Sequence, residues 1–94
     1  MKIKVLRTRE EVELGLQHLP RIPDDTIYVF AGPFLGGQFH SRNVPEPFEL
    51  IFLSRELNIL TVNRVIPPDG VAAVPPGTVY ALEARPGVLD QFIK

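Results

Sequence analysis

The side chains best suited to chemistry in this sequence gather in the stretch FHSRNVPEPFE. Four of them form one candidate ligand-binding group: His40, Arg42, Asn43 and Glu49. An arginine can bind a carboxylate or another small anion, because its guanidinium donates parallel hydrogen bonds in a fixed geometry. The same residues also suit a structural role, since Asn43 can bond its own backbone in a turn and Arg42 can pair with Glu46 or Glu49. We favour the structural role and keep the anion site as the alternative.

Nucleophiles and bases do not combine into a catalytic pattern. Ser41 follows His40 directly, and neighbouring residues of a strand point to opposite faces. The sequence lacks the G-x-S-x-G elbow of serine hydrolases, and the glycines of GPFLGG lack the Lys-Ser/Thr that completes a phosphate loop. Asp24 and Asp25 stand just before an apolar strand, where neighbouring acids usually form a solvated turn. We therefore expect a protein without enzymatic activity.

The sequence also lacks a recognisable ligand pattern for a metal ion. It has two histidines, His18 and His40, and no cysteine, so the ligand spacing of a zinc site is absent. Asp24, Asp25 and Asp69 do not follow the order of a calcium-binding loop. Without cysteine there is no disulfide bond. We expect no metal and no cofactor.

Length and charge bound the remaining classes. The 94 residues form one domain, residues 1–94, because a second core would need more chain. Ten basic and eleven acidic residues are interspersed and leave a net charge of −1, whereas a nucleic-acid-binding domain usually carries a basic stripe. The start MKIKVLRTREE has no apolar signal segment, and no apolar run approaches the roughly 20 residues that span a bilayer. We expect a cytoplasmic protein, or a virion protein if a phage encodes it, with no nucleic-acid or membrane partner.

The elements that must position these residues are mostly strands. Apolar runs predict strands at Lys2–Leu6, Ile27–Phe30, Gln38–Ser41, Phe48–Leu53, Ile59–Ile66 and Val79–Ala84. The motif TREE predicts a helix that begins at Thr8 with a capping box and continues to Pro20, and Val88–Ile93 suggests a short terminal helix. A long loop is expected over residues 67–77. The pattern favours a mostly β fold, a small antiparallel β-sandwich or open barrel with one N-terminal helix and a short C-terminal helix.

Two loops carry large apolar side chains that have no local core. Phe34 and Leu35 stand between a proline and a glycine pair, and the run from Val71 to Val74 lies between prolines. These loops either fold back over the sheet and complete the core, or they form an exposed patch for another chain. Phe34, Leu35, Val71 and Val74 are our candidate interaction residues. Glu49 is a further anomaly, because it interrupts an apolar strand and would be costly to bury without a partner.

Taken in order, these segments resemble a family of small β-domains described as "domain of unknown function 192". The similarity begins at Gly15-Leu16 and continues through IPDDTIYVF. It is most specific in FHSRNVPEPFELIFL, where the family's pattern is matched by Arg42, Asn43, Pro47 and Phe52. The closing segment PPGTVYALEARPG resembles the family's last strand. The resemblance covers most of the chain and implies a β-sandwich-like fold. It implies no reaction, because no activity defines the family.

Three residues depart from that family's usual pattern. Ser41 stands where the family has Met, Val44 where it has Thr, and Glu49 where it has Asp. A site built from the Thr and Asp side chains would therefore be altered. The sequence also ends at Lys94, before the Gly-Asp strand that usually follows, and an open sheet edge invites pairing with another chain.

These observations lead to one function hypothesis and one alternative. The first is a non-enzymatic interaction or structural module that binds other protein subunits or copies of itself, for example a capsid-decorating protein of a phage. The alternative, from a different class, is a domain that binds or hydrolyses a small anionic ligand near Arg42 and Asn43.

Overall fold

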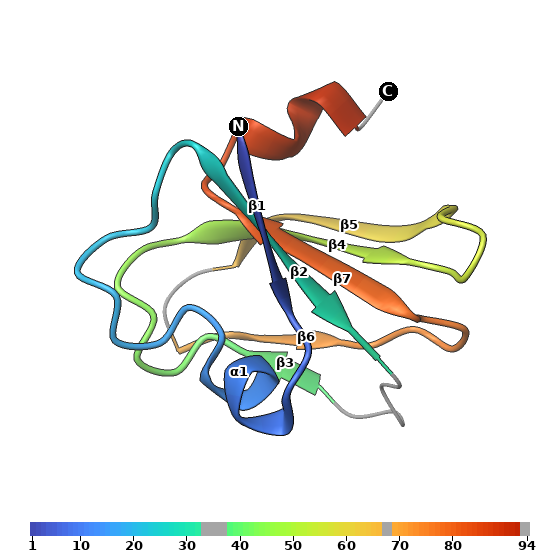
Figure 1. The fold of residues 1–94 in the computed structure, drawn as a ribbon, viewed down its shortest axis with the longest axis horizontal. Coiled ribbons are helices and arrows are strands. Elements are labelled where there is room, and N and C mark those ends of the chain that lie inside the picture. Colours follow the sequence, from blue (N-terminus) through green and yellow to red (C-terminus); the bar gives the residue numbers. More distant parts are fainter. Residues whose placement is uncertain (33–37, 67–68, 93–94) are drawn as a thin grey trace.

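Strands form most of the folded chain (Figure 1). The computed structural model describes residues 1–32, 38–66 and 69–92, and these residues contain seven strands in two sheets. The strands are β1 (Lys2–Leu6), β2 (Thr26–Ala31), β3 (Gln38–His40), β4 (Phe48–Leu53), β5 (Ile59–Ile66), β6 (Val71–Ala73) and β7 (Tyr80–Ala84). Two short helices accompany them, α1 (Arg9–Leu14) and the 3-10 helix η1 (Val88–Phe92). The mostly β class predicted from the sequence is confirmed.

The larger sheet has five strands in the order β1-β2-β7-β4-β5. Its central strand β7 pairs antiparallel with β2 and β4, and β5 pairs antiparallel with β4. β1 instead pairs parallel with β2, which departs from the predicted antiparallel arrangement. A parallel neighbour requires a crossover of about a dozen residues or more, and residues 7–25, which contain α1, provide it.

The five-stranded sheet buries apolar side chains on both faces. On the inner face, which packs against α1 and the two-stranded sheet, Phe30, Leu50 and Phe52 are at most 1% exposed. On the outer face Ile51 is fully buried in a cluster with Leu89 of η1. Strand β4 is thus buried on both faces, in keeping with its nearly continuous apolar run FELIFL.

The helix α1 begins at the predicted capping box and is shorter than expected. The Thr8 side chain accepts a hydrogen bond from the Glu11 N–H at 3.1 Å, and the Glu11 carboxylate accepts one from the Thr8 N–H at 3.1 Å. The bond from the Thr8 backbone is the main cause that holds the pKa of Glu11 below its usual value. The helix ends at Leu14 because Gly15 follows with a φ of 52°, a conformation that glycine adopts without steric cost. Leu16, expected on the helix, still packs into the inner core at 1% exposure.

The two-stranded sheet contains one strand, β6, that was predicted to be loop. It pairs antiparallel with β3. The Ser41 hydroxyl fastens the two segments, since it accepts a hydrogen bond from the Gly70 N–H at 2.6 Å and donates one to the Gly70 carbonyl at 3.2 Å. Ser41 is fully buried. A three-residue strand has too little periodicity to be distinguished from a loop by its sequence.

The 3-10 helix η1 stands where a short terminal helix was predicted, over Val88–Ile93; Ile93 lies outside the described residues. The turn before it is held by Glu49, whose carboxylate accepts a hydrogen bond from the Gly87 N–H at 2.9 Å. η1 then covers part of the outer face of the larger sheet through Leu89. Within the described residues, neither helix has the length and apolar character needed to cross a membrane.

Candidate functional site

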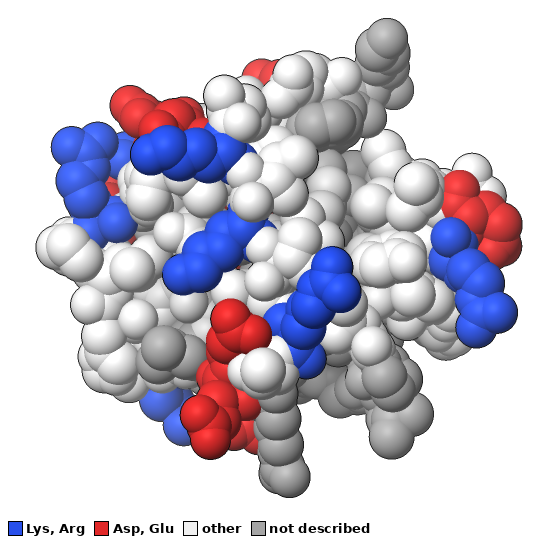
Figure 2. All heavy atoms as spheres, viewed as in Figure 1, with Lys and Arg blue, Asp and Glu red and all other residues white. Residues whose placement is uncertain are grey.

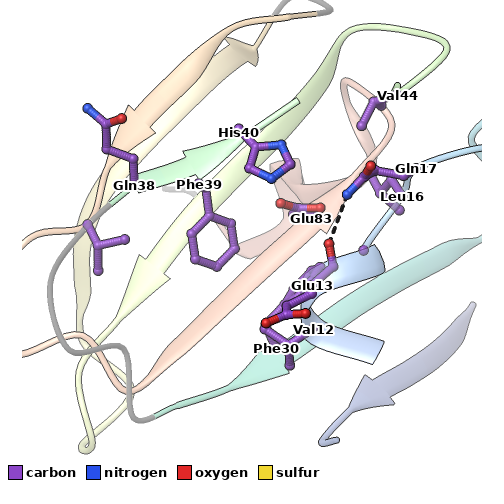
Figure 3. A pocket seen from close by; sticks show the side chains of 12 residues that line it. Val12, Glu13, Leu16, Gln17, Phe30, Gln38, Phe39, His40, Val44 and Glu83 are labelled. Atoms are coloured by element: carbon purple, nitrogen blue, oxygen red, sulfur yellow. Dashed lines mark hydrogen bonds between the residues drawn. The ribbon is translucent and has the colours of Figure 1, made fainter. Parts of the chain in front are cut away.

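A pocket opens between the two sheets and is bordered by α1 (Figure 3). Its volume is about 230 Å³. A cavity of about 150 Å³ is enough to hold benzene, so the pocket has room for a small organic molecule. The larger sheet contributes Phe30 from β2 and Glu83 from β7, the smaller sheet contributes Phe39 and His40 from β3, and α1 contributes a side wall.

Most of the pocket wall is apolar. Its apolar residues are Val12, Leu16, Phe30, Phe39, Val44 and Val74. The Phe39 ring meets Phe30 edge-to-face with the ring centroids 5.5 Å apart, and it meets Phe52 in the same way at 5.3 Å. Such aromatic pairs add to the stabilisation from burial. They hold the Phe39 ring against the larger sheet although β3 is only three residues long.

Glu83 places a carboxyl group at the floor of this pocket. The residue is 4% exposed and lies on the inner face of β7, beside Tyr28 of β2 and Leu50 of β4 in the sheet register. Among the described residues no hydrogen bond or ion pair reaches its carboxyl. Burial raises the pKa of Glu83 from 4.5 to about 8, because the charged form loses its hydration. The carboxyl is therefore mostly protonated at neutral pH.

The Glu83 carboxyl is not sealed inside the core. Every enclosed side-chain oxygen or nitrogen in the described part of the chain has a hydrogen-bond partner. The Glu83 carboxyl oxygens have no hydrogen-bond partner among the described residues. They are therefore not enclosed, and they remain in contact with the pocket space. Figure 3 shows the side chain extending from β7 into the space between His40 and the residues of α1.

Polar side chains border the pocket at its rim. They are Glu13, Gln17, Gln38 and His40. The His40 Nδ1 accepts a hydrogen bond from the Arg42 N–H at 3.3 Å, and an accepting Nδ1 leaves the proton of a neutral imidazole on Nε2. The Gln17 side chain donates a hydrogen bond to the Glu13 carbonyl at 2.8 Å. These contacts orient the rim without using the Glu83 carboxyl.

Arg42 and Asn43, two of the predicted ligand-binding residues, lie in the turn after β3 and not in the pocket lining. Both are exposed. Asn43 has a φ of 61°, and its carbonyl accepts a hydrogen bond from the His18 N–H at 2.9 Å. Its side-chain amide donates to Gln17 at 3.4 Å. Of the four predicted residues, His40 alone lines the pocket.

Glu49 lies on the opposite face of the larger sheet from the pocket. It is 3% exposed, and the Gly87 N–H supplies a hydrogen bond to its carboxylate. Glu46, which was considered as a partner of Arg42, instead forms an ion pair with Arg85 at 2.8 Å. The structure therefore does not bring His40, Arg42 and Glu49 together into one site.

The predicted interaction residues also separate. Phe34 and Leu35 lie outside the described residues. Val71 is 60% exposed on β6. Val74 is half-buried, packs against the inner core and lines the pocket. At this residue the chain folds back over the sheet, which is one of the two arrangements expected for the loop.

Sequence reasoning did not single out Glu83, although a signal was present. Glu83 is the acidic residue of the strand segment YALEA, where apolar residues otherwise dominate. The same anomaly drew attention to Glu49 in FELIFL. An acid inside an apolar strand is costly to bury. Its presence there therefore indicates a structural or functional role for the residue.

A second apolar surface lies on the outer face of the larger sheet. A groove of about 280 Å³ there is lined by aliphatic residues: Ile51, Leu53, Leu57, Ile59 and Leu82. Leu57 is 64% exposed and Ile59 is 42% exposed. At the β1 edge of the same sheet Ile3 is 64% exposed and Val5 is 38% exposed. Part of the outer face is thus covered by η1 and part is open to solvent.

Charged side chains of both signs are mixed on the face drawn in Figure 2. The Lys2 ammonium and the Asp25 carboxylate, both largely exposed, form an ion pair at 3.7 Å. The face in view therefore lacks the continuous basic stripe that is typical of a nucleic-acid surface. Within the described ranges no three His, Asp or Glu side chains are grouped so that they could hold a metal ion.

Comparisons with known proteins establish the fold and no function. No protein-family model matches the chain, and no curated protein sequence matches it. Solved structures with a similar fold include a protein of unknown function from Novosphingobium aromaticivorans, with a TM-score of 0.82, 23% identity, and coverage of 98% of this chain and 69% of that chain. Another is a "putative transcription regulator" from Sinorhizobium meliloti, with a TM-score of 0.82, 16% identity, and coverage of 96% of this chain and 72% of that chain. The resemblance to the domain of unknown function 192 family stays a prediction.

Proposed function

We propose that this domain binds a small molecule in the pocket between its two sheets and performs no chemistry on it. The observation that carries the proposal is the Glu83 carboxyl, which lies at the pocket floor at 4% exposure. Burying such a group without a hydrogen-bond partner is costly, and a bound ligand would supply the partner. Ionisable residues with strongly shifted pKa values in clefts are frequent at functional sites, and apolar pockets with a few polar groups are typical of ligand sites.

The contrast with Glu49 supports a binding role for Glu83. Both residues belong to the larger sheet, and both are almost fully buried. Glu49 receives a hydrogen bond from the Gly87 N–H within the fold, as expected of a structural acid. Glu83 faces open space instead. A structural explanation of Glu83 would require a partner like that of Glu49 in the described part of the chain.

The residues around the pocket favour binding over catalysis. Among the described lining residues no serine, threonine, cysteine or lysine stands beside Glu83 as a nucleophile. His40 lies at the exposed rim, and its Nδ1 is engaged by the Arg42 N–H. Covalent hydrolysis needs a nucleophilic side chain, which the described lining residues do not supply. For these reasons we place the hydrolytic form of the alternative below simple binding.

Filling the pocket tests the proposal. Val74→Trp enlarges a residue that lines the pocket, and Val71→Trp makes the same change at an exposed residue of β6. A mixture of neutral, cationic and anionic fragments is screened by ligand-observed NMR against the wild-type protein and both variants. We expect hits on the wild type and on Val71→Trp, and their loss on Val74→Trp. A wild type without hits, or hits that Val74→Trp leaves unchanged, would refute the proposal; circular dichroism checks that both variants fold.

A second candidate function is binding to another protein subunit or to a second copy of this chain. Its support is the aliphatic groove on the outer face, where Leu57 and Ile59 are in contact with solvent, because contiguous exposed apolar surface often marks an interface. A phage capsid-decorating protein, located in the virion, is one specific form of this hypothesis. A cytoplasmic location belongs with the small-molecule hypothesis.

Light scattering after size-exclusion chromatography at micromolar concentration tests the self-associating form of this second candidate. We expect an oligomer that dissociates in Leu57→Lys and persists in Val71→Lys, which changes an exposed valine outside the groove. A monomer at every concentration would contradict self-association. Flanking capsid or tail genes would favour the capsid form, and flanking metabolic genes would favour the small-molecule hypothesis.

Two finer descriptions of the fold belong to the same proposal. Side chains from both sheets line the pocket, which supports interpreting the domain as a small β-sandwich or open barrel. Membership of the domain of unknown function 192 family would be consistent with that interpretation.

A further inference from the structure

We infer that the pocket selects a small organic ammonium ion, which donates hydrogen bonds to Glu83 while its apolar part contacts Phe30 and Phe39. This inference rests on the proposed binding function and adds the chemical class of the ligand. Its geometric basis is a carboxyl that is 4% exposed, meets no partner among the described residues, and faces a cavity of about 230 Å³.

The ionisable groups around the pocket favour a cation. Glu83 lies at the floor and Glu13 at the rim, and the described lining residues include no lysine or arginine. The ionised form of Glu83 would repel an anion, and Arg42, the cation considered for an anion site, is not in the lining. An ammonium group would form charge-assisted hydrogen bonds with a carboxylate, and such bonds are stronger in surroundings of low dielectric constant.

The apolar walls of the pocket indicate which organic group should carry the ammonium. Phe30 and Phe39 meet edge-to-face with centroids 5.5 Å apart, and aromatic rings attract cations as well as apolar groups. Leu16, Val44 and Val74 complete an aliphatic surround. A pocket somewhat larger than the roughly 150 Å³ needed for benzene suits an amine with a small aromatic or branched aliphatic body. Benzylamine is a probe of that size.

Binding of an ammonium ion should displace a proton from the protein. Burial raises the pKa of Glu83 to about 8, so the free carboxyl is mostly neutral, whereas the ammonium ion needs the ionised form. If deprotonation of Glu83 limits binding, the affinity should rise by about fifty-fold from pH 6 to pH 8. A neutral hydrogen-bond acceptor would show the opposite trend, because it prefers the protonated carboxyl.

Among the described residues, three other titratable groups lie on the elements around Glu83. They are Glu13 on α1, His40 on β3 and Tyr28 on β2, and β4 presents Leu50. Burial raises the pKa of Tyr28 above its usual 10, so Tyr28 does not titrate between pH 6 and 8. Histidines as a class do titrate there, and His40→Gln is therefore the matched control.

Benzylamine, benzyl alcohol and benzoate serve as cationic, neutral and anionic probes of similar shape. Each is titrated at pH 6 and pH 8 into the isotope-labelled protein, its Glu83→Gln variant and its His40→Gln variant, with amide shifts followed by NMR. We expect benzylamine to bind the wild-type protein more tightly than benzyl alcohol or benzoate. Its affinity should rise by about fifty-fold from pH 6 to pH 8. Glu83→Gln should lose about tenfold or more in benzylamine affinity together with the pH dependence, whereas His40→Gln, a change at the pocket rim, should retain the pH dependence.

The possible failures separate the two proposals. If benzyl alcohol or benzoate binds as tightly as benzylamine, or if benzylamine binds less well at pH 8, the ammonium class is wrong and the binding function stands. The class is equally wrong if other fragments bind and benzylamine does not. Loss of the pH dependence in His40→Gln would assign the titration to the imidazole and overturn the role of Glu83. If neither these probes nor the fragment mixture bind to the pocket, the proposed function fails as well.

Discussion

Glu49 and Glu83 lie on adjacent antiparallel strands and on opposite faces of one sheet, because the register pairs Glu49 with Ala84 and Leu50 with Glu83. They are 3% and 4% exposed. The Glu49 carboxylate receives a hydrogen bond from the Gly87 N–H at 2.9 Å and so secures the turn that leads to η1. The Glu83 carboxyl meets the pocket space. Glu49 and Glu83 are thus buried to almost the same extent, but Glu49 is hydrogen-bonded within the fold and Glu83 faces the pocket.

The first prediction concerns the pH dependence of stability. The pKa of Glu83 is raised from 4.5 to about 8 in the folded protein, so the folded state holds this proton more tightly than the unfolded state. The free energy of unfolding should therefore fall as pH rises from 4.5 to about 8. In Glu83→Gln this contribution is absent, and the variant's stability relative to wild type should rise by about 4 kcal/mol across that range.

Urea denaturation at a series of pH values measures this difference. Glu56→Gln, at an exposed position of the turn between β4 and β5, is the control and should follow the wild-type profile closely. If the difference between wild type and Glu83→Gln is the same at pH 5 and pH 8, the Glu83 carboxyl is not protonated in the folded protein at neutral pH.

The second prediction concerns Arg85 and Glu46, which together satisfy both backbone groups of Ile22. Arg85 donates to the Ile22 carbonyl at 2.8 Å, and Glu46 accepts from the Ile22 N–H at 2.9 Å. The two side chains are joined at 2.8 Å, and each is about 30% exposed (32% and 29%). Arg85→Ala should cost about 2 kcal/mol, because it leaves a buried carbonyl and a carboxylate without their partner.

The control for Arg85→Ala is Lys2→Ala. The Lys2–Asp25 pair is 3.7 Å apart, with side chains 78% and 54% exposed, and its removal should leave the free energy of unfolding almost unchanged. Thermal and urea unfolding measure both variants. Equal losses would show that the Arg85–Glu46 contacts behave as an ordinary surface ion pair.

The third prediction concerns Ser41, which connects β3 to the segment before β6. Ser41→Ala removes the acceptor of the Gly70 N–H, a bond of 2.6 Å at a fully buried residue. We expect a loss of about 1–3 kcal/mol in the free energy of unfolding. Hydrogen exchange of the β3 and β6 amides should also become faster.

Ser54→Ala is the matched control for Ser41→Ala. The Ser54 hydroxyl accepts from the Asn58 N–H at 3.1 Å in an exposed turn, where water can replace it. The loss there should stay near 0.5 kcal/mol, the low end for a hydrogen bond. A Ser41→Ala variant as stable as Ser54→Ala would mean that the Gly70 backbone finds another partner.

Local sequence patterns were sufficient for most strands and for the start of α1. The apolar runs of β4 and β5 give the bounds Phe48–Leu53 and Ile59–Ile66, as observed, and the Thr8–Glu11 capping box depends on residues three positions apart. The parallel pairing of β1 with β2 was not predicted. Pairing between distant segments leaves no local pattern, and the same reason applies to β6, whose strand character depends on β3.

The pocket was less predictable than the strands, since it forms from residues that are distant in sequence. Phe30, Phe39 and Glu83 come from β2, β3 and β7. His40 was selected for its chemistry and does line the pocket, whereas Glu49 was selected on the same ground and belongs to the other face. Strand alternation alone assigns two faces to a strand; it does not say which face meets a cavity.

The position of β7 has a consequence for the order in which the protein can be assembled during synthesis. This strand pairs with β2 on one side and β4 on the other, yet the ribosome makes it after both. Until Tyr80–Ala84 has emerged, the nascent chain holds β2 and β4 with unpaired backbone edges and with the apolar side chains of Ile51 and Phe52 unprotected. Such edges readily pair with other chains, so the growing chain is most prone to aggregate before this strand has been made.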